Sequence, residues 1–398
     1  MYAKFFVFIF LFLSMLAEAK TASAALTYSS QSNLVIDDLS FTNGSNGAAI
    51  TLTNCSNVLI SNCNFMINSS VVGVKLNNCS NIEITNNYFE NFSSGIYAVN
   101  CTGGINIHCN SFKNIAGAKP RGQMVQFNTC SGSGNKVNYN ILEHEYGSGN
   151  PEDIINMYAS SGAGGDPIQI IGNHLRGGGP STSGGGIMVG DNGSHDILVD
   201  GNVLVDVGQY GISAPSGYNI TISNNQIYGA MQTWTNVGIY VGLQAEINAG
   251  FACSGSTISV TNNLVNFTNK NNVQNGWYNC SCCSGVITSG NNFKASSIIS
   301  SILPDSLVLD GANCASLATA LNIKITKNKK NIFPNPAHEF IQLNEFNQGG
   351  ICRIFDQLGI LQLEVRIDIS LQRIDISTLS SGVYFLQHNG EIFKLIKW

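Results

Sequence analysis

The sequence predicts an all-β protein, in which a solenoid of the parallel β-helix type is followed by a small antiparallel β-sandwich. Three observations predict this fold: an unusual composition, a repeated strand pattern, and a change in composition after about Asn322. Of 398 residues, 50 are Asn and 42 are Gly, while only 11% are charged. Asn and Gly are poor helix formers, so long helices are not expected. With 19 Lys and Arg against 24 Asp and Glu, the charge also argues against nucleic acid as a partner.

The N-terminus has the pattern of a secretory signal peptide. Lys4 precedes an apolar run from Phe5 to Leu16, and Ala22-Ser23-Ala24 provides a small-x-small cleavage site, with Ala17-Glu18-Ala19 as an earlier alternative. We therefore expect a signal peptide over residues 1–24. The apolar run is too short to cross a bilayer, and no later run reaches the roughly 18 residues required. We expect no membrane span in the mature protein.

The main part of the chain repeats a segment of alternating apolar residues that ends in Asn. Asn81–Phe89 and Asn219–Ile227 are clear copies. The last Ile or Val before the Asn falls at Ile36, Ile60, Ile84, Ile107, Val137, Ile170, Val199, Ile222 and Val260. A second short strand follows each copy, as in Gly186–Val189 and Gly211–Ala214. Two or more strands in a repeat of roughly 23 residues can close one coil of a parallel β-helix, which we expect over residues 25–300.

Identical positions of stacked coils form ladders along a solenoid, and this explains much of the composition. One register holds Asn87, Asn110, Asn140, Asn173, Asn202, Asn225 and Asn263, at a turn where side-chain amides can bond neighbouring coils. Another register holds Cys55, Cys79, Cys101 and Cys130, which suit small buried positions. The cluster of Cys280, Cys282 and Cys283 leaves disulfides, packed thiols and a metal site open. Residues 25 to about 295 thus resemble the right-handed parallel β-helix, or pectin-lyase-like, superfamily in architecture, without a catalytic motif of any subfamily.

The C-terminal segment has short alternating strands separated by turn signals, which predicts a small antiparallel sandwich after a cap and linker at residues 301–330. Its four blocks are Asn331–Ala337, Arg353–Gly359, Ile374–Phe385 and Lys394–Lys397. In this order they resemble the type A C-terminal sorting domain of type IX secretion. The resemblance implies that residues 331–398 bind the type IX secretion machinery. It also implies a protein that is secreted or held at the cell surface of a Gram-negative bacterium.

Three consecutive coils carry insertions after the Asn turn, at residues 113–122, 143–152 and 174–184. An extra loop on a solenoid needs a reason, and such loops gather on binding faces. These insertions and their borders hold Lys119, Arg121, His144, Glu152, Asp153, His174 and Arg176. Alignment of the second strands places Gln126, Asn156, Met188, Ser213 and Tyr240 in one outward row, with Asp191 just beyond Met188. We expect a groove for an extended polysaccharide, contacted by Asn156, Tyr158, His174, Tyr210 and Tyr240.

Two chemistries fit these residue types. A glycoside hydrolase needs two carboxyl groups across the scissile bond, for which Asp153 and Asp191 are suited and Glu152 could replace either. A polysaccharide lyase needs a base and a cation beside a uronate, for which Lys119, Arg121, His144 or Arg176 would serve. Acidic residues could hold calcium in that case; otherwise no cofactor or metal is expected. The alternative is a non-catalytic, adhesin-like solenoid that binds glycans at the cell surface.

Overall fold

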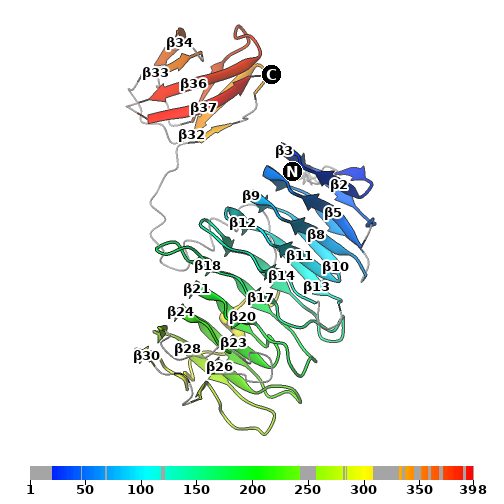
Figure 1. Cartoon of the computed structure of the whole chain (residues 1–398), viewed down its shortest axis with the longest axis vertical. Helices are drawn as coiled ribbons and strands as arrows, with labels where there is room; N and C mark the ends of the chain where they lie inside the picture. Colours follow the sequence, from blue (N-terminus) through cyan, green and yellow to red (C-terminus); the bar gives the residue numbers. More distant parts are fainter. Residues whose placement is uncertain are drawn as a thin grey trace, which may run out of the picture. The chain divides into compact units, whose positions relative to one another are not determined.

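The computed structural model confirms the predicted fold (Figure 1). It describes residues 20–45, 47–67, 70–117, 122–242, 257–280, 283, 285–307, 331–333, 337–344, 351–356, 360–366, 371–388 and 391–397. The chain divides into two compact units, Met1–Leu321 and Asn322–Trp398. The first unit contains three parallel sheets of ten strands each, and the second contains two small antiparallel sheets.

The right-handed parallel β-helix of the first unit has three strands in each coil, one in each of the sheets that we call A, B and C. Sheet A contains β1 (Thr21–Ser23), β4 (Leu39–Phe41), β7 (Asn64–Met66), β10 (Tyr88–Phe92), β13 (Ser111–Ile115), β16 (Ile141–Glu143), β19 (His174–Arg176), β22 (Val203–Val205), β25 (Gln226–Gly229) and β28 (Leu264–Phe267). Sheet B contains β2 (Leu26–Ser29), β5 (Ala48–Thr53), β8 (Val72–Asn77), β11 (Ser94–Val99), β14 (Val125–Asn128), β17 (Ile155–Tyr158), β20 (Ile187–Asp191), β23 (Tyr210–Ala214), β26 (Val237–Val241) and β29 (Trp277–Asn279). Sheet C contains β3 (Ser32–Asp37), β6 (Ser56–Ser61), β9 (Ser80–Thr85), β12 (Ile105–His108), β15 (Lys136–Asn138), β18 (Ile168–Ile171), β21 (His195–Asp200), β24 (Tyr218–Ser223), β27 (Ile258–Thr261) and β30 (Val286–Ser289). A short 3-10 helix, η1 (Ser300–Ile302), follows.

The repeat register predicted from the sequence is the register of sheet C. Ile36 pairs with Ile60, Ile60 with Ile84, and Ile84 with Ile107, and the remaining predicted copies pair in the same way up to Val260. The repeat that reads as one strand in the sequence is two strands in the structure. The chain bends at the Asn turn, so that Ser80–Thr85 lies in sheet C and Tyr88–Phe92 lies in sheet A.

The Asn residues form the predicted ladder at the turn between sheets C and A. Asn140 donates both its backbone N–H and its side-chain N–H to Asn173 Oδ1, at 3.0 and 3.1 Å. Asn173 does the same to Asn202 Oδ1, at 2.9 Å each. The ladder continues through Asn225 and Asn263 to Asn291. Buried backbone N–H groups need acceptors. The side-chain oxygen of each ladder Asn accepts from the backbone of the preceding coil, and its side-chain nitrogen donates to the Asn of the next coil.

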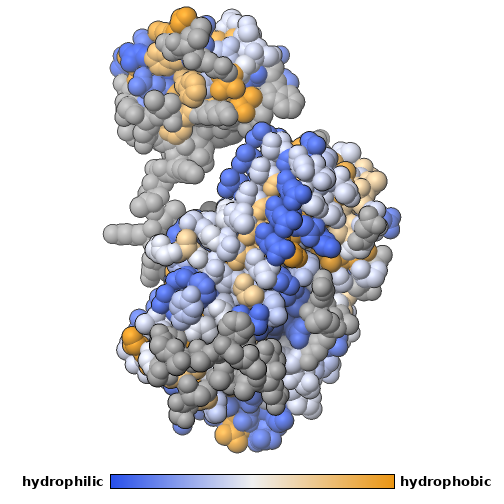
Figure 2. All heavy atoms as spheres, in the orientation of Figure 1, coloured by the Kyte–Doolittle hydropathy of each residue, from blue (hydrophilic) through white to orange (hydrophobic). Residues whose placement is uncertain are grey.

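The solenoid interior is filled by stacked apolar side chains. Phe41, Phe65, Phe89 and Phe112 form a continuous ring stack beneath sheet A, with centroids 5.0, 4.3 and 4.6 Å apart. The predicted cysteine register is also buried, with free thiols. Cys109, Cys280 and Cys283 are instead disulfide-bonded. On the face of the solenoid in Figure 2, apolar side chains appear as separate small spots between hydrophilic ones.

The second unit is a pair of antiparallel sheets around its own core. One sheet contains β31 (Asn331–Phe333), β32 (Phe340–Asn344) and β35 (Leu371–Asp375), and the other contains β33 (Ile351–Phe355), β34 (Leu361–Arg366), β36 (Gly382–His388) and β37 (Glu391–Lys397). Ile341, Ile354, Ile374, Leu386 and Leu395 are buried between the two sheets. This core is separate from that of the solenoid, so each unit buries its own apolar surface.

Candidate functional site

The outward row predicted on the second strands exists on sheet B. Gln126 pairs with Asn156, Asn156 with Met188, Met188 with Ser213, and Ser213 with Tyr240. The middle of the row is buried, because Asn156 is only 4% exposed, and Met188, which packs with Tyr210 and Tyr240, is only 7% exposed. The described residues therefore form a covered site at this point rather than an open groove.

A β-bulge places Asp191 beside this row. Asn156 pairs with Met188, yet Tyr158 pairs with Asp191, so strand β20 has one more residue than β17 between these pairs. Gly190 lies in the extra stretch with a φ of 80°, which glycine adopts without strain. In a regular register Gly190 would lie opposite Tyr158. The bulge instead brings a carboxyl group to the end of the strand, beside Asn156.

Asp153 and Asp191 are joined through one side-chain amide. Asn156 Nδ2 donates to Asp153 Oδ2 at 2.8 Å and to Asp191 Oδ2 at 3.4 Å. Because the two hydrogen bonds share one nitrogen atom, these carboxyl oxygens are at most 6.2 Å apart. Asp153 Oδ1 accepts hydrogen bonds from the Gly185 backbone N–H at 3.1 Å and from the Tyr210 hydroxyl.

The two carboxyl groups differ in burial and therefore in ionisation. Asp153 is 4% exposed, and its burial raises its pKa to about 7, although the donors from Tyr210, Asn156 and Gly185 oppose the shift. Burial also raises the pKa of Asp191, which is only half-buried at the mouth of the site. A carboxylic acid that keeps its proton near neutral pH can act as a general acid.

The other predicted residues on this side of the solenoid have different surroundings. Glu152 is half-buried and accepts a hydrogen bond from the Ser183 hydroxyl at 3.2 Å. Tyr210 is buried and donates its hydroxyl hydrogen bond to Asp153, so its ring is not available for the predicted stacking on a sugar. Tyr158 and Tyr240 are half-buried, and the Tyr240 ring stacks on Tyr278 with centroids 5.5 Å apart. Glu152 and Asp191 are thus the more exposed carboxyl groups near Asp153.

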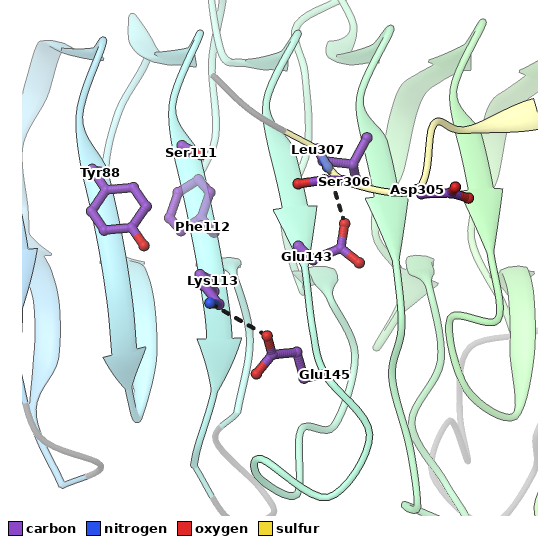
Figure 3. A pocket seen from close by; sticks show the side chains of 9 residues that line it. All are labelled: Tyr88, Ser111, Phe112, Lys113, Glu143, Glu145, Asp305, Ser306 and Leu307. Atoms are coloured by element: carbon purple, nitrogen blue, oxygen red, sulfur yellow. Dashed lines mark hydrogen bonds and ion pairs between the residues drawn. The ribbon is translucent and has the colours of Figure 1, made fainter. Parts of the chain in front are cut away.

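Arg176, a predicted catalytic cation, holds a returning segment of the chain. Its guanidinium donates to the carbonyl oxygens of Leu303 and Asp305 at 3.0 Å each, and it pairs with Glu143 at 3.4 Å. Glu143 also accepts from the Leu307 backbone N–H at 3.3 Å. We call residues 303–307 the strap; Figure 3 shows its last three residues crossing the strands of sheet A above a cavity of about 350 Å³. These contacts give Arg176 a structural role away from the carboxyl pair.

The remaining predicted bases and cations do not join Asp153 and Asp191 in the described part of the chain. His174 begins strand β19 on sheet A, and burial lowers its pKa to about 4. Burial lowers the pKa of His144 to about 4 as well. Lys119 and Arg121 lie outside the described residues. Among the residues that the structure describes, the carboxyl pair therefore has no basic partner.

Sequence reasoning missed Gly190, Ser183 and Trp234 as parts of this region. The signal for Gly190 was weak, since a bulge glycine reads like any other glycine in a chain with 42 of them. Ser183 lies in the glycine-rich run 177–186, which gave no register. Trp234 lies outside the three insertions, in the loop after β25, and reaches the second and third of them only in three dimensions.

Two family models match parts of the chain. Residues 331–397 match the secretion system C-terminal sorting domain. The C-terminal unit is a secretion system C-terminal sorting domain. The resemblance drawn from its four sequence blocks is confirmed, and the sorting domain shows that the protein is secreted or lies at the cell surface.

The described residues contain no helix of the length and hydropathy that a membrane span requires.

Residues 15–151 match the model of the periplasmic copper-binding protein NosD. The described residues of the solenoid do not fit a copper site. Its free cysteines are buried and donate to backbone carbonyls, as Cys63 does to Ser61 at 3.1 Å. No group of three or more His, Cys, Asp or Glu gathers among the described residues. The match therefore concerns the solenoid architecture, and we derive no metal chemistry from it.

Several solved structures have a similar fold at low identity. A mutant tailspike protein of E. coli bacteriophage HK620, in complex with a pentasaccharide, is 12% identical, with 66% of this chain and 56% of that chain covered and a TM-score of 0.35. The tailspike protein of Acinetobacter baumannii phage AM24 is 10% identical, with 91% and 63% covered and a TM-score of 0.37. A mannuronic acid specific polysaccharide family 6 lyase from human gut microbiota is 10% identical, with 75% and 89% covered and a TM-score of 0.29. The chain spans less than two thirds of the length of these tailspikes, and no curated protein matches it.

Proposed function

We propose that the solenoid is a secreted glycoside hydrolase in which Asp153 and Asp191 form the catalytic carboxyl pair. One observation carries the proposal: two carboxyl groups share the Asn156 amide, and burial raises the pKa of the inner one to about 7. In this role Asp153 donates a proton to the glycosidic oxygen as the bond to the leaving sugar breaks. Asp191 acts from the mouth of the site on the anomeric carbon or on a water molecule.

The spacing of the pair is compatible with retention of anomeric configuration. Retaining glycosidases hold their carboxyl groups about 5–5.5 Å apart, and inverting ones hold them about 6.5–9.5 Å apart to admit a water molecule. One oxygen of Asp153 and one oxygen of Asp191 are at most 6.2 Å apart, which the retaining geometry allows. In this mechanism Asp191 is the nucleophile, and Asn156 keeps the two carboxyl groups in register.

Among the described cations, the position of Arg176 speaks against a lyase. A lyase needs a cation to neutralise the uronate carboxylate and a base to remove the neighbouring proton. Arg176 is held by the strap and by Glu143, and the described surroundings of Asp153 and Asp191 contain no Lys, Arg or His bonded to either. Calcium at the acidic mouth stays a prediction of the sequence.

A second candidate, glycan binding without cleavage, is favoured by the burial of Asp153. Both of its oxygens already accept hydrogen bonds, which is also the arrangement of a structural carboxyl group. In that case Asn156 and Asp191 would bind sugar hydroxyls, and the protein would be an adhesin.

A panel of polysaccharides assayed for new reducing ends and for unsaturated products separates these functions. The hydrolase produces reducing ends without unsaturation, and Asp153→Asn and Asp191→Asn each lower the rate by at least about 100-fold, as expected for loss of an acid or a nucleophile. Glu90→Gln on sheet A is a matched control and should retain activity. Unsaturated products would contradict the hydrolase, and full activity in both variants would contradict the site.

A further inference from the structure

A second cavity lies beside the start of the loop Gly177–Gly186, which runs from β19 to the carboxyl site. It has a volume of about 320 Å³ and is lined by His144, Tyr146, Arg176, Gly177, Gly178, Asp206, Gln232 and Trp234. These residues lie at the end of, or just after, the sheet A strands β16, β19, β22 and β25 of four successive coils, where the chain turns toward sheet B. The loop Gly177–Gly186 thus borders this cavity at its start and contacts Asp153 through Gly185 near its end.

Two aromatic rings form one wall of the cavity. The rings of Tyr146 and Trp234 are nearly parallel, at 11°, with centroids 5.8 Å apart. Tyr146 is 79% exposed, although a large aromatic side chain at the surface is costly to hydrate. Exposed, parallel aromatic faces are surfaces on which the apolar face of a sugar ring can pack.

The glycine run makes this wall possible. A side chain at Gly179 would reach within 2.5 Å of the Trp234 indole nitrogen, and one at Gly177 would collide with the His144 carbonyl oxygen. Gly177 and Gly179 also have φ values of 78° and 74°. The run therefore lets bare backbone lie against Trp234 and His144.

Polar groups lie beside the aromatic wall. Asp206 Oδ1 accepts from the Ala230 backbone N–H at 2.7 Å, and its second oxygen adds an acceptor at the cavity. His144 Nδ1 accepts from the Ile115 N–H at 3.1 Å, so the ring proton is on Nε2, which has no partner among the described residues. His144 is 4% exposed, and a buried N–H without an acceptor is costly.

We propose that this cavity is a second sugar-binding subsite for a neutral sugar residue of the glycan that the carboxyl site acts on. The sugar ring packs on Tyr146 and Trp234, and its hydroxyl groups bond to Asp206 and Gln232. A neutral sugar fits better than a uronate, because Arg176 is already bonded to Glu143 and the strap, and Asp206 would face a uronate carboxylate. A volume of about 320 Å³ is at the small end of ligand sites and suits a single ring. This inference rests on the proposed function for the identity of the ligand.

Tryptophan fluorescence tests the subsite directly, because the chain has only three Trp residues. In a full-length protein that carries Trp277→Phe, Trp398→Phe and the inactivating Asp191→Asn, Trp234 is the single reporter. Cellohexaose, xylohexaose, mannohexaose, laminarihexaose and a galacturonic acid hexamer are the probes. We expect at least one neutral hexasaccharide to shift the emission of Trp234 saturably, and the galacturonic acid hexamer to bind at least about tenfold more weakly.

Tyr146→Ala in this background should weaken binding by about tenfold or more, and it is safe for folding because the side chain is exposed. Tyr218→Ala on sheet C, 43% exposed, is the matched control and should leave the affinity unchanged. The subsite is refuted if no neutral probe shifts the emission, if Tyr146→Ala binds as tightly as its parent, or if the uronate hexamer binds more tightly. Because cleavage by Asp153 and Asp191 is assayed separately, failure of the subsite is distinguishable from failure of the proposed hydrolase.

Discussion

Removal of one rung from the Asn ladder should destabilise the solenoid strongly. Asn173 is fully buried, and its side chain makes four hydrogen bonds: it accepts two from Asn140 and donates to Val137 O at 2.8 Å and to Asn202 Oδ1 at 2.9 Å. Asn173→Ala leaves the Asn140 backbone N–H without an acceptor in the interior. An unsatisfied buried group costs about 1–3 kcal/mol, and the cavity and the unpaired Val137 carbonyl add to this cost. We expect the free energy of unfolding to fall by about 3 kcal/mol.

Urea denaturation of the protein, followed by far-UV circular dichroism, measures this change. Asn271→Ala is the control, because Asn271 is exposed, is outside the ladder and should change the stability by less than about 0.5 kcal/mol. Parts of a solenoid can unfold separately. The midpoints of two variants are therefore compared only if the free energy of unfolding has the same dependence on urea concentration in both. If Asn173→Ala unfolds at the same urea concentration as Asn271→Ala, the ladder does not carry the stability assigned to it.

Three further outcomes follow from the structure. If the signal peptide is removed, we expect cleavage after Ala19 rather than after Ala24. Cleavage after Ala24 would remove β1, which pairs with β4 in the first coil. The intact mass of the secreted protein decides between the two sites. Arg176→Ala should free the strap, so limited proteolysis followed by mass spectrometry should show new cleavage at residues 303–307, and an unchanged pattern would contradict the role of Arg176. Burial raises the pKa of Cys63 to about 11, so this thiol should resist iodoacetamide at pH 8 in the folded protein and react in urea; rapid labelling of the native protein would show that the coil is open there.

The fold could be predicted from the sequence because a solenoid repeats its constraints. The alternation that ends in Asn recurs in most coils, so Ile84 and Val199 occupy equivalent positions. A wrong assignment in one coil therefore does not change the predicted fold. The division of each repeat into strands of sheets C and A was missed, because only Asn86 and Asn87 separate Thr85 from Tyr88. The turn shifts the apolar alternation by only one position, between the buried Ile84 and Phe89. The sorting domain could be recognised from blocks of turn and strand residues that are local in the chain.

The site was harder to predict, because its geometry depends on features that do not repeat. Glu152, Asp153, Asn156, Asp191 and Tyr210 were all named from their places in the register, and the structure brings them into one region. The bulge that brings Asp191 beside Asn156 and the burial of the row by neighbouring side chains depend on tertiary packing. The role of Arg176 depends on the strap, which is about 130 residues further along the chain.

The pH dependence of kcat/KM on a cleaved glycan tests the carboxyl pair most directly. Asp153 must be protonated to act as the acid and has a pKa of about 7, so the rate should fall as the pH rises through about 7. Asp191→Asn should remove activity over the whole range without altering the circular dichroism spectrum. A wild-type rate that stays constant between pH 5 and 9 would contradict the assignment of Asp153 as the acid, and reducing-end release by Asp191→Asn at the wild-type rate would contradict the pair.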